Sequence, residues 1–126
     1  MIRLTAKTEA ELKQILDELL KGVTPIFGEK LKRVILFGSY ARGDYDEESD
    51  IDIMFLIDDD AKTLNSKYRK PVCIVASNIG LKHDILLCSV LQNEHDFYEY
   101  VNSIPFYKNV EREGITLYGQ KYAAIL

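Results

Sequence analysis

The fold is decided by the stretch Val34-Ile35-Leu36-Phe37-Gly38-Ser39, which is followed after a polar segment by Ser49-Asp50-Ile51-Asp52-Ile53-Met54-Phe55-Leu56-Ile57. Each of the two apolar runs in it has the length of a buried strand. Gly and Ser at the end of the first run predict a turn, and residues 39–42 predict one helical turn. Residues 43–49 are polar and predict a loop. The stretch therefore predicts two neighbouring strands of one sheet.

Acidic residues gather in and around this stretch. Nine of the twenty lie between positions 44 and 60, and no Lys or Arg interrupts them. Those at 44–48 and 58–60 fit solvated loops. Asp52 does not, because it stands inside an apolar strand, where an ionised carboxylate costs free energy unless it is paired or bound to a metal. We therefore interpret Asp52 as a functional residue.

The spacing of the polar residues predicts a site for a metal and a phosphate. Gly38 lets the backbone approach a ligand closely, and backbone N–H groups together with the Ser39 hydroxyl can bind an anion such as phosphate. Asp50 and Asp52 share one face of an extended chain, about 6–7 Å apart along the backbone. Mg²⁺ would relieve their repulsion, since it typically binds one or two carboxylates plus substrate phosphates. Arg42 is placed to neutralise phosphate charge.

Outward from this stretch, periodicity predicts helices and further strands in alternation. Thr8 and Glu11 have the spacing of a capping box at the start of a first helix, which Gly22 would end. Pro71 would kink a later helix or begin its second half, and Gly80 would end it. The predicted order is helix 8–21, loop 23–32, strands 34–37 and 51–57, helix 62–78, strand 84–89, helices 93–101 and 105–113, and an edge strand 115–118. This order is typical of the α/β (α+β) class: a small mixed β-sheet flanked by helices, forming one domain over residues 1–126.

Composition excludes several classes of function. The chain is 47% hydrophobic and 29% charged, which is ordinary for a folded domain. No apolar stretch approaches the roughly 20 residues of a membrane span. A net charge of −4 argues against direct nucleic-acid binding through a broad basic surface. Cys73 and Cys88 lie in apolar surroundings, so a reduced, cytoplasmic protein is expected.

The motif Gly38-Ser39, ten residues, then Asp50-Ile51-Asp52 resembles that of the nucleotidyltransferase fold shared by DNA polymerase β and its relatives. It is most similar to the minimal nucleotidyltransferases, many of which are antitoxins paired with a HEPN-domain toxin. The resemblance extends over most of the chain, up to residues 106–115. Only the Gly-Ser and Asp-x-Asp elements are sharply diagnostic.

The resemblance implies a reaction and a set of roles. Gly38, Ser39 and Arg42 would bind the triphosphate of ATP, and Asp50 and Asp52 would hold Mg²⁺. Family members usually carry a third carboxylate on a later strand, and Asp84, which opens the third apolar run, is the matching candidate. It would bind a second metal ion and help to deprotonate the acceptor. The reaction would transfer AMP to a hydroxyl, on a tyrosine of the partner HEPN toxin.

Two other functions stay open. The domain could neutralise a toxin by binding alone, or it could modify a small molecule as an oligomer. The intact carboxylates favour an enzyme over a binding module. A Rossmann site, a Walker A loop, a metalloprotease and a Ser-His-Asp hydrolase are excluded, because their motifs are absent. Residues outside the motif are interpreted more simply: Tyr40 as a rim residue of the site, His83 and His95 as surface residues, and the aromatic residues from 97 to 107 as core or partner surface.

Overall fold

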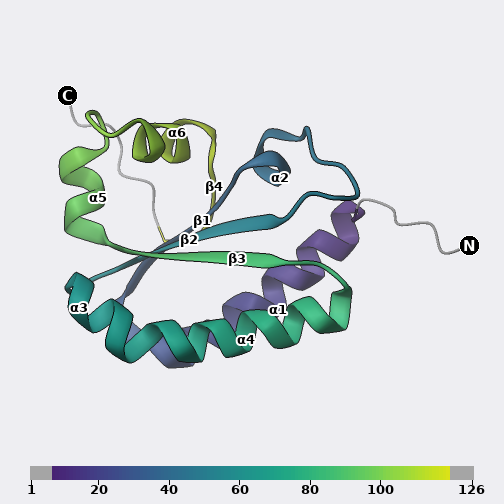
Figure 1. Ribbon diagram of the computed structural model, residues 1–126, viewed down its shortest axis with the longest axis horizontal. Coiled ribbons are helices and arrows are strands. Elements are labelled where there is room, and N and C mark those ends of the chain that lie inside the picture. Colours follow the sequence, from purple (N-terminus) through teal and green to yellow (C-terminus); the bar gives the residue numbers. More distant parts are fainter. Residues whose placement is uncertain (1–6, 120–126) are drawn as a thin grey trace, which may run out of the picture.

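The computed structural model describes residues 7–119 and contains a four-stranded mixed sheet with the strand order β3-β2-β1-β4 (Figure 1). β1 runs antiparallel to both β2 and β4, whereas β3 runs parallel to β2. The prediction of a mixed sheet with the last strand at its edge is confirmed. The strands are β1 Leu31–Phe37, β2 Ile51–Ile57, β3 Leu87–Asn93 and β4 Ile115–Gly119.

Helices cover both faces of the sheet (Figure 1). α1 (Glu9–Phe27) and α4 (Arg69–His83) pack together below it and enclose the larger core. α2 (Ser39–Arg42), α5 (Glu94–Tyr100) and α6 (Pro105–Glu113) lie above it, and a smaller core lies beneath α5 and α6. Short turns complete the chain: η1 Gly28–Lys30, α3 Ala61–Thr63 and the π-helical turn η2 Leu64–Tyr68. In the part of the chain described here, no helix combines the length and apolar character needed to cross a membrane.

The first helix is longer than its sequence pattern suggested. The predicted capping box of Thr8 and Glu11 is confirmed, with both reciprocal hydrogen bonds present. The predicted stop at Gly22 and the loop over 23–32 are wrong, because Val23 and Phe27 continue the buried stripe. A side chain at Gly22 would meet Val75 Cγ1 at 2.5 Å. This glycine therefore allows α1 to approach α4 closely instead of ending the helix.

The boundary between α4 and β3 also differs from the prediction. α4 passes Gly80 and ends at His83. Pro71 lies in the first turn of α4, after α3 and η2, which fits the predicted alternative that it begins the second half of this helical segment. Asp84 caps this helix in the left-handed conformation, with φ 54° and ψ 51°, and the Ile85 N–H donates to the Gly80 carbonyl at 3.0 Å. A side chain at Gly80 would lie 2.5 Å from the Ile85 carbonyl oxygen, so this glycine permits the chain to turn back. The third strand therefore begins three residues after Asp84.

A buried cation joins the upper helices to the sheet. Arg33, on β1, is fully buried and makes two hydrogen bonds of 2.9 Å to the carboxylate of Glu111 on α6. It also donates to the Tyr98 hydroxyl at 3.0 Å and to Thr116 Oγ1 at 3.1 Å. Burial alone would lower the pKa of Arg33, but its bonds to Glu111 and Tyr98 outweigh this and raise it. One side chain thus fixes α5, α6 and β4 against β1.

Candidate functional site

The turn at the end of β1 brings backbone against a carboxylate of β2. Gly38 has φ 75° and ψ −156°, which only glycine adopts readily. A side chain at this position would collide with Oδ2 of Asp52. The Gly38 carbonyl accepts hydrogen bonds of 3.1 Å from the N–H groups of Ala41 and Arg42, which begins the predicted helical turn α2. Gly38 and Asp52, which are fourteen positions apart in the sequence, therefore form one surface.

The two aspartates of the motif lie at the start of β2. Asp50 is exposed and directly precedes the strand, whereas Asp52 is half-buried within it and pairs with Phe37 on β1. Burial raises the pKa of Asp52, and the negative charge of Asp50 raises it further; a hydrogen bond from Cys88 and the charge of Arg42 act in the opposite direction. The surroundings of Asp52 in the folded chain therefore disfavour its ionised form. This is the environment that we predicted for a carboxylate whose charge a bound cation would stabilise.

A thiol that the sequence motif does not indicate lies beside these two carboxylates. Cys88, on β3, is the parallel-strand partner of Asp52, and its Sγ donates to Asp50 Oδ2 at 3.9 Å. Burial raises the pKa of the thiol, and the charges of Asp50 and Asp52 add to this effect. The apolar surroundings predicted for Cys88 are those of its sequence neighbours and not of its side chain. Only the register of β2 and β3 reveals the contact, and no sequence signal gives that register.

Arg42 is engaged by carboxylates around the site. Its guanidinium pairs with Asp44 at 3.2 Å and with Glu113 at 3.5 Å, so it links α2 to the end of α6. The hydrogen bond to Asp44 is the main reason why the pKa of Arg42 is raised. The side chain is 43% exposed, and its charge also acts on Asp52. Its predicted contact with phosphate stays a prediction.

Asp84 lies elsewhere than its sequence position suggested. Its position before an apolar run predicts the opening of the third strand, but it is an exposed residue at the end of α4. The residue opposite Asp52 on β3 is Cys88. The strand pairing therefore groups Asp50 with Asp52 and Cys88, and the role of Asp84 as third carboxylate stays a prediction.

Two further interpretations are corrected by packing. Tyr40 is buried and stacks on Tyr45 with ring centroids 4.2 Å apart, so it supports α2 from within and does not form a rim. His83 is largely covered and pairs with Glu18 of α1. The aromatic segment from 97 to 107 is mixed, because Phe97 is fully buried whereas Phe106 is exposed.

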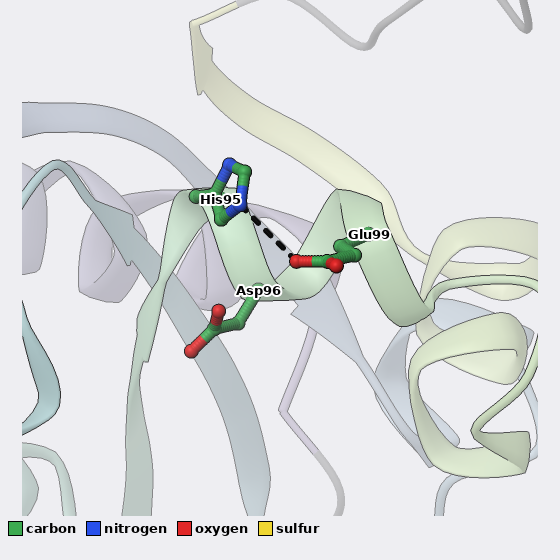
Figure 2. A group of neighbouring side chains, drawn as sticks. All are labelled: His95, Asp96 and Glu99. Carbon is green, nitrogen blue, oxygen red and sulfur yellow. Dashed lines mark ion pairs between the residues drawn. The ribbon is translucent and has the colours of Figure 1, made fainter.

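A second group of possible metal ligands lies on α5. His95, Asp96 and Glu99 each offer a ligand atom, and these atoms lie within 4.8 Å of one another. Figure 2 shows the ion pair between His95 and Glu99, with Asp96 beside them on the same helix. The pair joins His95 Nε2 to Glu99 Oε2 at 3.1 Å, and both side chains are exposed, as expected for His95. This group follows the end of β3, whereas Asp50 precedes the start of the parallel strand β2, so the two groups lie at opposite ends of the sheet.

The donor set around β2 fits a divalent cation that is shared with phosphate. Asp50 and Asp52 supply hard oxygen ligands on one face, and the Gly38 turn leaves backbone instead of a side chain beside them. Mg²⁺ suits this arrangement, because it needs few protein ligands when substrate phosphates supply the others. The predicted grouping of Gly38, Asp50 and Asp52 is therefore present in the fold.

Comparison with known proteins agrees with this arrangement. Residues 10–115 match the family described as nucleotidyltransferase domain. Two proteins of Methanocaldococcus jannaschii are similar to the chain, and both are named putative protein adenylyltransferase. MJ0141 is 40% identical and the match covers 83% of this chain and 97% of that protein. MJ0604 is 34% identical, with 82% and 94% covered.

Solved structures show the same fold. A toxin–antitoxin crystallised with AMP-PNP aligns with a TM-score of 0.56 and 22% identity, over 86% of this chain and 74% of that one. A tri-AMPylated HEPN toxin of Shewanella oneidensis in complex with its MNT antitoxin gives a TM-score of 0.52 and 20% identity, over 86% and 72%. The chain belongs to the nucleotidyltransferase domain family and has the polymerase β-like nucleotidyltransferase fold.

Proposed function

We propose that this nucleotidyltransferase moves AMP from ATP-Mg²⁺ to a tyrosine hydroxyl of a HEPN-domain partner and thereby acts as its antitoxin. The observation that carries the proposal is the half-buried Asp52, which lies beside Asp50 and directly against the Gly38 turn. Within residues 7–119 this carboxylate forms no ion pair, although the charge of Arg42 acts on it. It is explained if the site holds a metal and a triphosphate during its working cycle.

Each residue of the site has a part in the proposed reaction. The backbone at Gly38 and the hydroxyl of Ser39 bind phosphate oxygens, and Asp50 and Asp52 hold the metal. Bound Mg²⁺ supplies charge stabilisation for the attacking and leaving oxygens of the displacement. Arg42 adds positive charge at the edge of the site, where Asp44 and Glu113 keep it oriented.

The reaction is a displacement at the α-phosphorus of ATP. A bond forms between the acceptor hydroxyl oxygen and this phosphorus, and the bond to the bridging oxygen of the β-phosphate breaks. Pyrophosphate leaves with that electron pair, and the hydroxyl proton passes to a carboxylate or to solvent. The sequence indicates Asp84 as the carboxylate that accepts this proton. Its exposed position before β3 gives that role no support.

The names of similar proteins support a protein, and not a small molecule, as the acceptor of AMP. Two relatives with more than 30% identity are named putative protein adenylyltransferases, which favours a protein acceptor over a small molecule. The AMPylated HEPN toxin found with an MNT antitoxin shows that a domain of this fold can accompany such a product. The acidic loop between α2 and β2, next to the site, suits a partner with a basic surface.

The proposal is tested by mass spectrometry of candidate HEPN-domain proteins from the same organism, each incubated with this protein. With unmodified protein, ATP and Mg²⁺, we expect the partner to gain the mass of one adenylyl group per transfer, on tyrosine. Asp50→Asn combined with Asp52→Asn should abolish the adduct and the protection of cells. The triple variant His95→Ala, Asp96→Asn and Glu99→Gln is the matched control and should retain both.

The runner-up is a binding module, which the resemblance left open. If the double aspartate variant protects cells as well as the unmodified protein, and no adduct forms under any condition, the catalytic proposal is wrong. The fold would then serve recognition alone. If an adduct forms on a small molecule but never on a protein, the domain would instead be a small-molecule nucleotidyltransferase.

A further inference from the structure

An aromatic side chain lies beside the half-buried aspartate, at the end of β1. Phe37 is the last residue of β1, directly before the Gly38 turn, and it is the antiparallel partner of Asp52 on β2. Side chains of residues that pair directly across neighbouring strands lie on the same face of a sheet. Phe37 packs against the smaller core, so both side chains lie on the face that α6 covers. Asp52 therefore has an apolar neighbour on its β1 side.

A second ring, that of Phe106, extends this apolar surface from the first turn of α6. Its centroid lies 5.6 Å from that of Phe37, with 78° between the ring planes. This edge-to-face geometry is one that aromatic pairs prefer. Phe106 is nevertheless 44% exposed. Contact with Phe37 thus fixes one edge of the pair next to the proposed nucleotide site, while much of the Phe106 ring stays open to solvent.

The helix that carries Phe106 is held at the same end of β1 by charged side chains. Glu111 of α6 accepts two hydrogen bonds of 2.9 Å from the buried Arg33. At the end of the helix, Glu113 pairs with Arg42 of α2 at 3.5 Å. A surface that is held in place before its ligand arrives loses less conformational entropy on binding. α6 therefore presents a positioned aromatic ring from its first turn and reaches the phosphate side of the proposed site with its last.

We propose that the base of the bound nucleotide stacks on Phe106 and that this contact gives the site a preference for purines. The inference rests on the proposed function, because it places the triphosphate at Gly38 and the metal at Asp52. Cys88 lies beside Asp52 on the β3 side, whereas the two rings lie on the β1 side. The base is assigned to the β1 side, since any base can stack on an aromatic face. The larger ring system of a purine covers more of that face than a pyrimidine does.

Calorimetric titration of Phe106→Leu with ATP and Mg²⁺ tests the proposal. Leucine keeps an apolar contact with Phe37 but removes the aromatic face, so ATP should bind at least about fivefold more weakly, the lower end of what one base–aromatic stack contributes. Inorganic tripolyphosphate with Mg²⁺ has no base and should bind the variant and the unmodified protein equally. Phe106→Trp should retain the affinity for ATP, because it restores an aromatic face.

Tyr100 provides the matched control for this titration. It is an aromatic residue of α5 with the same exposed fraction as Phe106, 44%. Tyr100→Leu should bind ATP as the unmodified protein does. If Phe106→Leu keeps full affinity for ATP, or loses affinity for ATP and tripolyphosphate to the same extent, the stacking proposal is wrong. Equal losses of ATP affinity in the two leucine variants would also contradict it.

A second measurement uses the unmodified protein and decides the matter if Phe106→Leu does not fold. In the full chain with ATP and Mg²⁺, nuclear Overhauser contacts should join the ring protons of Phe106 to H2 or H8 of adenine. ATP and GTP should both bind more tightly than CTP and UTP. Adenine contacts with other aromatic rings alone, or equal affinity for all four nucleotides, would overturn the proposal.

Failure of this inference can be told apart from failure of the proposed function. If ATP binding depends on Phe106 but no AMP adduct forms on a protein, the stacking contact stands and the transfer proposal fails. If the adduct forms and Phe106→Leu binds ATP normally, the reaction stands and the stacking proposal fails. If that variant binds ATP normally but no longer binds the HEPN-domain protein, Phe106 contacts the partner and not the base.

Discussion

The two ends of the sheet each carry three potential metal ligands, and they differ in how those ligands are held. At one end, Asp50, which directly precedes β2, and Asp52 within β2 lie beside Cys88 of β3, so two strands contribute. At the other end, His95, Asp96 and Glu99 all come from the seven residues of α5 (Figure 2). The atoms of the α5 group are close together, yet closeness alone does not indicate a site.

The difference lies in whether the structure already explains each side chain. On α5, His95 and Glu99 form an exposed pair four residues apart, which is an ordinary helix-surface interaction. Asp96 lies in the first turn, where a negative charge favours a helix. Asp52 has no such explanation, because burial and the charge of Asp50 both act against its ionised form. An unexplained energetic cost is a better indicator of function than a cluster of suitable atoms.

The largest expected effect comes from removing one cluster and keeping the other. Asp50→Asn with Asp52→Asn should weaken the binding of ATP in the presence of Mg²⁺ by more than about tenfold, since the metal would lose both of the carboxylate ligands proposed for it. The triple α5 variant should bind ATP as the unmodified protein does. Isothermal titration calorimetry measures both. If the double variant binds ATP as tightly as the unmodified protein, or if the triple variant binds it more weakly, the α5 group and not the β2 aspartates would be the metal site.

A smaller effect is expected from a glycine that touches the site, compared with one that does not. Gly38→Ala adds a Cβ that collides with Asp52 Oδ2 and also forces alanine into a conformation that costs about 1–3 kcal/mol. Gly43 has φ 86°, and the space for a Cβ is open there. Gly43→Ala should therefore cost about 1–2 kcal/mol of stability for its left-handed backbone without affecting the site.

Denaturant unfolding and ATP titration separate the two glycine variants. Both should unfold more readily than the unmodified protein, and only Gly38→Ala should also lose affinity for ATP-Mg²⁺. If Gly43→Ala loses as much affinity as Gly38→Ala, loop strain and not the contact with Asp52 would explain the effect.

Sequence reasoning succeeded where chemistry is local and failed where it depends on strand pairing. The turn at Gly38 and the shared face of Asp50 and Asp52 follow from residue types and from the period of a strand, so both were predictable. Cys88 reaches the site through the register between β2 and β3, which local sequence does not encode. Asp84 was assigned to the strand because it precedes an apolar run, but the helix continues to His83 and needs a left-handed residue to end.

Asp52 is expected to lower the stability of the fold, and its replacement by a neutral residue should therefore raise that stability. Asp52→Asn should raise the melting temperature at neutral pH and without metal, by about 3–5 °C, because a neutral amide avoids the burial cost. The pKa of Asp52 is raised in the folded protein above its ordinary value of 3.8. The free energy of unfolding therefore falls as the pH rises from the unfolded-state pKa through the folded-state pKa of this carboxyl. The gain should therefore vanish at low pH, where Asp52 is protonated in both the folded and the unfolded states.

The α5 cluster provides the control for this measurement. Glu99→Gln removes an exposed pair that contributes about 0.5 kcal/mol or less, so it should lower the melting temperature slightly or leave it unchanged. Differential scanning calorimetry from pH 3 to 8 gives both profiles. A clear drop in the melting temperature of Asp52→Asn at neutral pH would mean that Asp52 is a structural hydrogen-bonding residue.

The smallest effect is expected at Asp84, and its replacement tests whether the proposed site extends as far as the end of α4. Asparagine tolerates the left-handed conformation that this residue adopts, so Asp84→Asn should change stability by less than about 0.5 kcal/mol. Its exposed position before β3 predicts that AMP transfer also stays within about twofold of the unmodified rate. Asp84→Ala is the control for backbone strain and should lower stability without slowing transfer. If both variants instead lose transfer as fully as the double aspartate variant while remaining folded, Asp84 is the third carboxylate after all, and the catalytic end extends beyond the paired strands to the end of α4.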